Sequence, residues 1–174
     1  MYNKSVLFDA RLISSSGIGT YIKEIIRELN GRVLLTCIST ADTKQDCSII
    51  AKGDVAAPTV YAVKEQMELT KVPACDIFFS PDFNIPLLPL KSKKRVVTIQ
   101  DIYPLALKRK ATLVQRVYAR VMLNIAVRLS DAVITASEFA KIKIIKHTGC
   151  SPKKIKVIYN GVKQKAFISY PQIV

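Results

Sequence analysis

Residues 6–29 constrain the fold of this chain more than any other stretch, because they read as a strand, a glycine loop and a helix in direct succession. A short apolar run from Val6 to Phe8 is followed by a serine-rich loop that leads to Gly17-Ile-Gly19. Behind the glycines, apolar residues recur at helical spacing up to Asn30-Gly31, which marks the end of a helix: Ile18, Ile22, Ile25 and Leu29. Such a helix must lay its apolar face on a sheet.

The glycine loop is a candidate phosphate-binding element. Glycines let a ligand approach the backbone closely, and the first turn of a helix presents N–H groups that favour an anion, so Gly17, Ile18 and Gly19 are predicted to face a phosphate. The alternative is that the two glycines only make a tight turn. A dinucleotide fingerprint would need a third glycine where Ile22 stands and a shorter loop after the strand. Although Asp42 lies about where a ribose-binding acid would be, the pattern disfavours a nicotinamide or flavin site.

Strand-like and helix-like segments alternate along nearly the whole chain. We expect strands at 6–8, 32–38, 76–79, 96–100, 132–135 and 156–159, and helices at 18–29, 61–72, 106–110, 113–129 and 137–148. Residues 39–57 carry no clear period and are expected to be an irregular, exposed excursion. This alternation predicts an α/β fold of one domain: a Rossmann-like, doubly wound parallel sheet.

Ligands of such a sheet bind at the carboxyl ends of its strands. The residues expected there, beside the glycine loop, are Asp9, Arg11, Ser80, Pro81, Asn84, Gln100, Asp101, Ser137 and Glu138. Every chain of this class places polar residues at strand ends, so their ordinary roles in turns and helix caps stand beside the functional ones.

Composition limits the partners. The 174 residues include 27 Lys plus Arg against 13 Asp plus Glu, a net charge of +14 that favours nucleic acid, anionic lipid or a phosphorylated substrate. The cysteines (Cys37, Cys47, Cys75 and Cys150) are scattered without a CxxC pair, which predicts neither a zinc site nor a disulfide framework. With neither a signal peptide nor a spanning segment in the sequence, a cytoplasmic location is expected.

Two basic stretches are candidates for an anionic membrane surface, which would make the protein peripheral on the inner face of the cytoplasmic membrane. The better one combines Lys108–Lys110 with Lys91, Lys93, Lys94 and Arg95, expected near the strand-end face. In the long helix, the favoured arrangement packs Val117, Val121 and Ile125 on the sheet and leaves the arginines in solvent. Nucleic acid is the less favoured partner, because the chain shows no nucleic-acid-binding motif and no Trp.

Taken in order, a set of segments resembles the N-terminal domain of retaining GT-B glycosyltransferases, the large family with many bacterial mannosyl- and glucosyltransferases of cell-surface polysaccharide synthesis. The segments are DAR with GIGTYI, KEQMEL, DIFFSPDFNIP, VVTIQDIYPL, SDAVITASEFAKIKIIK and KIKVIYNGV, and they cover almost the whole chain. The resemblance implies the acceptor-side half of a two-domain enzyme that uses a nucleotide-sugar donor and needs no cofactor or metal.

The resemblance also implies roles for single residues. Gly17, Ile18 and Gly19 would lie near the donor phosphates, with Ser137 and Glu138 at the helix that faces the cleft. Asp9, Arg11, Pro81 and Asn84 would belong to the acceptor side. Gln100-Asp101 stands where the family usually has His-Asp, whose histidine contacts the transferred sugar; an amide can still hydrogen-bond but cannot ionise.

The other departure from the family is length. The family's second domain binds the nucleotide sugar through a pair of glutamates and basic residues, and the 174 residues contain no such region. We therefore expect residues 1–174 to be one N-terminal domain, inactive without a donor-binding partner in a C-terminal domain or a separate subunit. A non-catalytic scaffold of the same fold is the alternative from another class, in which Gln100 marks lost chemistry.

Overall fold

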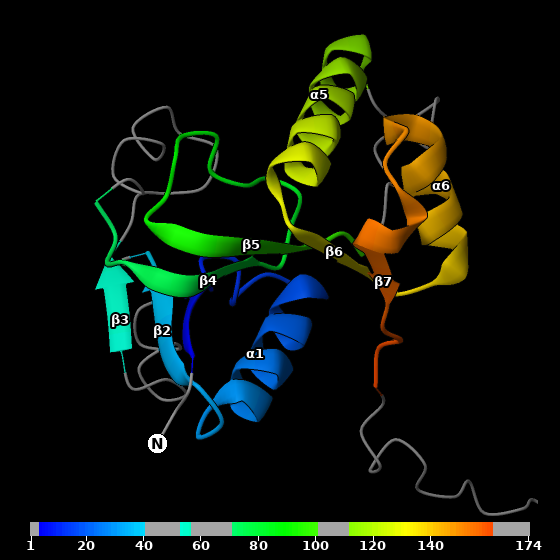
Figure 1. The fold of residues 1–174 in the computed structure, drawn as a ribbon. Helices are drawn as coiled ribbons and strands as arrows, with labels where there is room; N and C mark the ends of the chain where they lie inside the picture. Colours follow the sequence, from blue (N-terminus) through cyan, green and yellow to red (C-terminus); the bar gives the residue numbers. More distant parts are fainter. Residues whose placement is uncertain (1–3, 41–52, 57–70, 101–111, 162–174) are drawn as a thin grey trace, which may run out of the picture.

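The structure, a computed structural model, describes residues 4–40, 53–56, 71–100 and 112–161 (Figure 1). Within these ranges a single sheet has seven strands in the order β3-β2-β1-β4-β5-β6-β7, and every neighbouring pair is parallel. The strands are β1 (Ser5–Asp9), β2 (Leu34–Ser39), β3 (Gly53–Ala56), β4 (Cys75–Ser80), β5 (Ser92–Thr98), β6 (Ala132–Thr135) and β7 (Ile155–Val157). Strand order reverses between β1 and β4, which is the topological switch point of a doubly wound sheet. The predicted fold class is confirmed.

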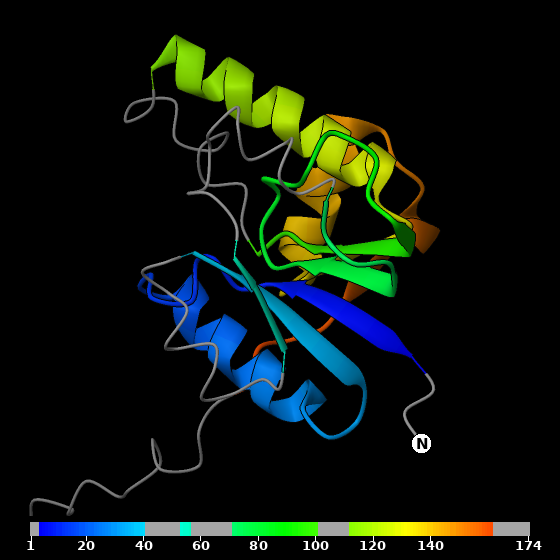
Figure 2. The same cartoon turned by 90° about the vertical axis from the view of Figure 1, so that its left-hand side faces the viewer.

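Helices cover both faces of this sheet (Figures 1 and 2). On one face, α1 (Ile18–Leu29) buries Ile22 and Ile26 against Val6 and Phe8 of β1. On the other face, α5 (Leu113–Leu129) and α6 (Glu138–Thr148) close a second core around Val97 and Val133. A short 3₁₀ turn, η1 (Pro152–Lys154), leads into β7.

Local sequence explains where these helices begin and end. Ser137 accepts a hydrogen bond from the Ala140 N–H and caps α6, as its place in the sequence predicts. Thr112 and Gln115 form a reciprocal capping box at the start of α5, so the backbone N–H groups of both residues are satisfied. Gly149 ends α6 in the left-handed conformation, at a φ of 67°.

Two expectations for the strands are corrected. The supposed irregular excursion contains β3, whose short sequence GDVA has little apolar signal and pairs along β2 at the sheet edge. The strand expected at 96–100 begins earlier and ends earlier, because β5 spans Ser92–Thr98 and includes the basic residues Lys93, Lys94 and Arg95. Of the helix predicted at 61–72, only residues 71 and 72 are described, and they form a turn rather than a helix. The helix predicted at 106–110, together with Asp42, Asp101 and Lys108–Lys110, lies outside the described residues.

The start of β5 also corrects the position of its basic side chains. Lys93, Lys94 and Arg95 lie at the amino end of this parallel strand, at the edge of the sheet opposite the carboxyl ends. Lys93 and Lys94 form ion pairs of 2.7 Å with Asp76 and Asp131, respectively. Lys93, Lys94 and Arg95 therefore do not lie at the strand-end face.

The expected orientation of α5 is wrong. Val117 and Val121, predicted to pack on the sheet, are 55% and 50% exposed, and Ile125 is only half-buried. The buried side of α5 consists instead of Ala119, Met122, Leu123, Ala126 and Val127. Because apolar residues occur on both sides of this helix, its sequence alone does not say which side meets the core.

Candidate active site

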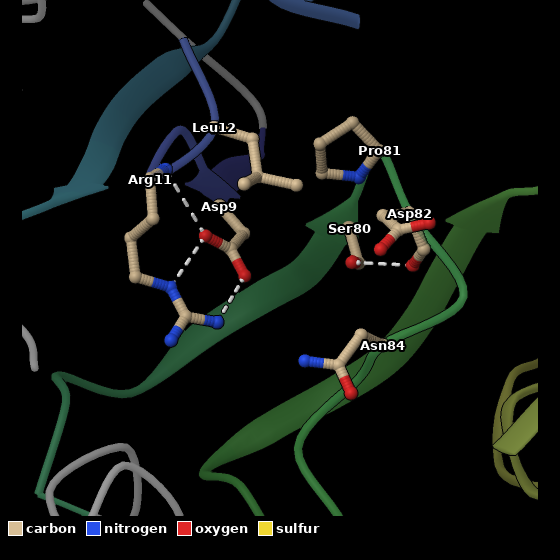
Figure 3. Close-up of a pocket in the computed structure, with 7 residues that line it drawn as sticks. All are labelled: Asp9, Arg11, Leu12, Ser80, Pro81, Asp82 and Asn84. Carbon is tan, nitrogen blue, oxygen red and sulfur yellow. Dashed lines mark hydrogen bonds and ion pairs between the residues drawn. The ribbon is translucent and has the colours of Figure 1, made fainter. Parts of the chain in front are cut away.

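A polar pocket lies at the carboxyl ends of β1 and β4, directly at the switch point (Figure 3). The residues that line it are Asp9, Arg11, Leu12, Ser80, Pro81, Asp82 and Asn84. The enclosed space is about 10 Å³, room for roughly one water molecule. Any ligand larger than a water molecule would therefore lie over this hollow rather than inside it, with the polar groups as one wall of a larger site.

One wall of the pocket is a buried ion pair. Arg11 donates from Nε to Asp9 Oδ1 at 2.8 Å and from Nη2 to Asp9 Oδ2 at 2.6 Å, a two-pronged arrangement. The side chains are only 1% and 8% exposed. The pair fixes both groups at the end of β1, so a ligand meets a rigid arginine and carboxylate rather than mobile ones.

The opposite wall is the loop after β4. Ser80 Oγ donates to the Asp82 carbonyl oxygen at 2.8 Å, which holds the loop in a tight turn (Figure 3). Burial raises the pKa of Asp82, and the nearby charge of Asp9 acts in the same direction, while the N–H groups of Phe83 and Asn84 partly offset the rise. Two carboxylates therefore approach one hollow from neighbouring strands.

Asn84 connects this pocket to α5. The Tyr118 hydroxyl donates to Asn84 Oδ1 at 3.1 Å, and the Asn84 side chain is buried. The orientation of the amide at the pocket is therefore set by a helix on the outer face of the sheet.

Gly17 and Gly19 of the glycine loop have different structural roles. Gly17 caps α1 with a φ of 72°, a conformation that glycine adopts without strain. Gly19 packs against the backbone of Ile13, so that a Cβ on it would lie 2.4 Å from the Ile13 carbonyl oxygen.

The amides of this loop are engaged within it. The N–H groups of Ile18 and Gly19 donate to the carbonyl oxygens of Ser16 and Ser15 at 2.9 and 3.0 Å. Close packing accounts for Gly19 in the structure, and contact of the loop with a phosphate stays a prediction.

The other predicted site residues that the structure describes are not brought to the pocket. Gln100 follows β5 and has its amide nitrogen buried, with no hydrogen-bond partner among the described residues. Ser137 caps α6, and Glu138 is exposed with its carboxylate 3.8 Å from the Lys141 ammonium. These residues follow β5 and β6, which lie farther from the switch point than β4.

Five residues expected at strand ends line this pocket together: Asp9, Arg11, Ser80, Pro81 and Asn84. Two further lining residues were not expected from the sequence. Leu12 supplies an apolar edge, and Asp82 supplies a carboxylate. The signal for Asp82 was its position directly after Ser80-Pro81, in the loop that must cross the end of β4.

Two further observations concern metals and membranes. Within the described ranges, no three His, Cys, Asp or Glu side chains gather in a cluster that could hold a metal ion. In the same part of the chain, no helix combines the length and apolar character needed to cross a bilayer.

A doubly wound parallel sheet with a polar pocket at its switch point defines a Rossmann-like α/β domain. The sequence profile described as Glycosyltransferase Family 4 matches residues 15–165, and the chain belongs to that family. No curated protein matches it in sequence.

Similar solved structures include Anabaena Alr3699/HepE in complex with UDP-glucose, with a TM-score of 0.65 at 16% identity. The same protein in complex with UDP and glucose, and with UDP, gives TM-scores of 0.62 at 17% and 18% identity. In each case the match covers 97% of this chain and 47% of the other, so the chain spans about half the length of the structures it resembles.

Proposed function

We propose that this chain is the acceptor-side half of a retaining glycosyltransferase that transfers a hexose of the mannose or glucose type from a nucleotide sugar to a cell-surface glycan or lipid-linked acceptor. The observation that carries the proposal is the polar pocket at the switch point of a Family 4 chain. Its guanidinium, carboxylates, amide and hydroxyl are the groups that hydrogen-bond sugar hydroxyls. Alr3699/HepE, which has the same fold over this length, is a protein seen with UDP-glucose.

In this proposal, the pocket orients the acceptor. Asp82 accepts hydrogen bonds from hydroxyl groups of the acceptor substrate, and the Asn84 amide donates to them. The Asp9–Arg11 pair holds the other wall rigid. The acceptor hydroxyl attacks the anomeric carbon on the face that the nucleoside diphosphate leaves, forming the new glycosidic bond as the bond to the diphosphate breaks. The hydroxyl proton passes to the departing diphosphate. Charge that develops on the leaving group is stabilised by N–H groups and cations, and no metal takes part.

The donor side of the reaction is assigned to a second domain or subunit. At the junction, the loop of Gly17, Ile18 and Gly19 and the start of α6 at Ser137 and Glu138 face the donor, and Gln100 and Asp101 lie at the transferred sugar. The 174 residues alone are expected to bind nucleotide sugar weakly or not at all.

Co-purification tests the proposal. The tagged chain is purified gently from the membrane fraction of its native cells, and its partners are identified by mass spectrometry. We expect a donor-binding polypeptide, or an extension of this chain, and hexose transfer by the assembled protein when nucleotide hexoses are supplied. An assembled protein that transfers no sugar from any nucleotide hexose would overturn the proposal.

A non-catalytic partner of the same fold is the second candidate, and it is favoured by one observation. Gln100 stands where a histidine is usual in the family that the sequence resembles. Its amide nitrogen is buried and has no hydrogen-bond partner among the described residues. The variant Gln100→His in the assembled enzyme separates the two candidates. A change in transfer rate assigns the position to the catalytic site, and an unchanged rate favours the scaffold.

A further inference from the structure

The side of α5 opposite its buried residues carries an exposed apolar stripe. Its members are Leu113, Val114, Val117, Tyr118 and Val121, which are 72%, 78%, 55%, 46% and 50% exposed. At about 100° per residue, these positions form one continuous surface opposite the buried side of the helix. In both views, the N-terminal half of α5 extends beyond the sheet as an outer edge of the molecule (Figures 1 and 2).

The charged residues of α5 itself are all positive. Helix α5 contains no Asp or Glu, and its exposed arginines include Arg120 and Arg128. Arg120 lies three residues after Val117, a spacing that places the two side by side on the helix surface. Arg128 follows Val121 by two helical turns on the same side. An apolar stripe bordered by arginines, in a chain of net charge +14, complements an anionic lipid surface.

We propose that the exposed side of α5, from Leu113 to Val121 with Arg120 and Arg128, is a membrane-docking surface that inserts its apolar side chains at the headgroup boundary of an anionic bilayer. A second copy of the chain is a poor occupant, because a symmetric contact would bring like charges together. The hydrogen bond from Tyr118 to Asn84 joins this surface to the pocket, so docking would place the pocket beside the lipid.

This inference goes beyond sugar transfer, and vesicle binding tests it without an enzymatic assay. The chain is sedimented with vesicles of phosphatidylcholine alone and with vesicles containing about 30 mol% phosphatidylglycerol. The double variant Val117→Gln/Val121→Gln keeps helix propensity while removing the centre of the stripe. The matched control, Leu34→Gln/Ile142→Gln, removes two apolar side chains of similar exposure, 58% and 62%, from β2 and α6.

We expect binding to the anionic vesicles that falls about tenfold or more in the α5 variant and stays unchanged in the control. Unchanged helical circular dichroism and melting temperature show that the variants are folded. A second variant, Arg120→Gln/Arg128→Gln, is expected to reduce the preference for anionic over neutral vesicles several-fold. Failure of the unaltered chain to bind anionic vesicles, or equal binding by the α5 variant, would overturn the proposal.

Discussion

Replacing Arg11 by methionine is predicted to be among the most destabilising single changes in the described part of the chain. The substitution keeps most of the side-chain volume but removes the cation that faces the Asp9 carboxylate, leaving a buried charge behind. Breaking a buried ion pair in this way costs about 3–5 kcal/mol. With an m-value of about 2 kcal/mol/M in urea, the unfolding midpoint should fall by roughly 2 M.

Urea unfolding followed by circular dichroism measures this change. The control is Arg27→Met, because Arg27 contacts Glu24 at a similar distance of 2.8 Å but is 60% exposed; its loss should cost about 0.5 kcal/mol or less. The double variant Asp9→Asn/Arg11→Met should cost clearly less than the sum of its single changes, because it leaves neither charge unpaired. A cost below about 1 kcal/mol for Arg11→Met would refute the view that the pair is buried and strongly coupled.

Three further predictions concern the glycine loop and two aspartates. Gly19→Ala should cost about 3 kcal/mol in urea unfolding, because the new methyl group would meet the Ile13 backbone, whereas Gly17→Ala, with open space but a φ of 72°, should cost only about 1–2 kcal/mol. The pKa of Asp82 is raised in the folded state, so ionisation of this carboxyl destabilises the fold as pH rises above its unfolded pKa of about 3.9. Asp82→Asn should therefore have a higher melting temperature than the unaltered chain at pH 7, and this difference should disappear near pH 3. Hydrogen bonds from Lys93 and Ser5 hold the pKa of Asp76 well below its usual range in the folded state. The stabilisation by the ionised carboxylate is therefore present above about pH 3.9 and is lost in acid. Asp76→Asn should have a lower melting temperature than the unaltered chain at pH 7, and the two melting temperatures should converge as pH falls.

The secondary structure was most predictable where local chemistry marks the ends of an element. The bounds of α1, α5, α6 and β6 follow from caps, breakers and apolar runs in the sequence. In contrast, β3 depends on pairing with β2 rather than on its own composition, which is why its sequence gave no signal. The orientation of α5 was not predictable either, since apolar residues lie on both of its sides.

The sequence predicts which residues follow each strand, and the pocket is formed by residues of this kind. Asp9 and Arg11 after β1 meet Pro81 and Asn84 after β4 because those two strands are neighbours at the switch point. Strand order is a tertiary property, so the sequence alone could not separate this group from Gln100 and the start of α6, which follow strands farther along the sheet. Contact geometry also identified Asp82, whose burial depends on the turn made by the loop.

A steady-state comparison of acceptor and donor tests the central claim most directly. The assembled transferase carrying Asp82→Asn is assayed with each substrate varied in turn. Loss of a charge-assisted hydrogen bond at the pocket should raise the KM for the acceptor about tenfold, while the KM for the nucleotide sugar stays within about twofold. A raised KM for the nucleotide sugar with an unchanged KM for the acceptor would contradict the account, because the pocket would then belong to the donor.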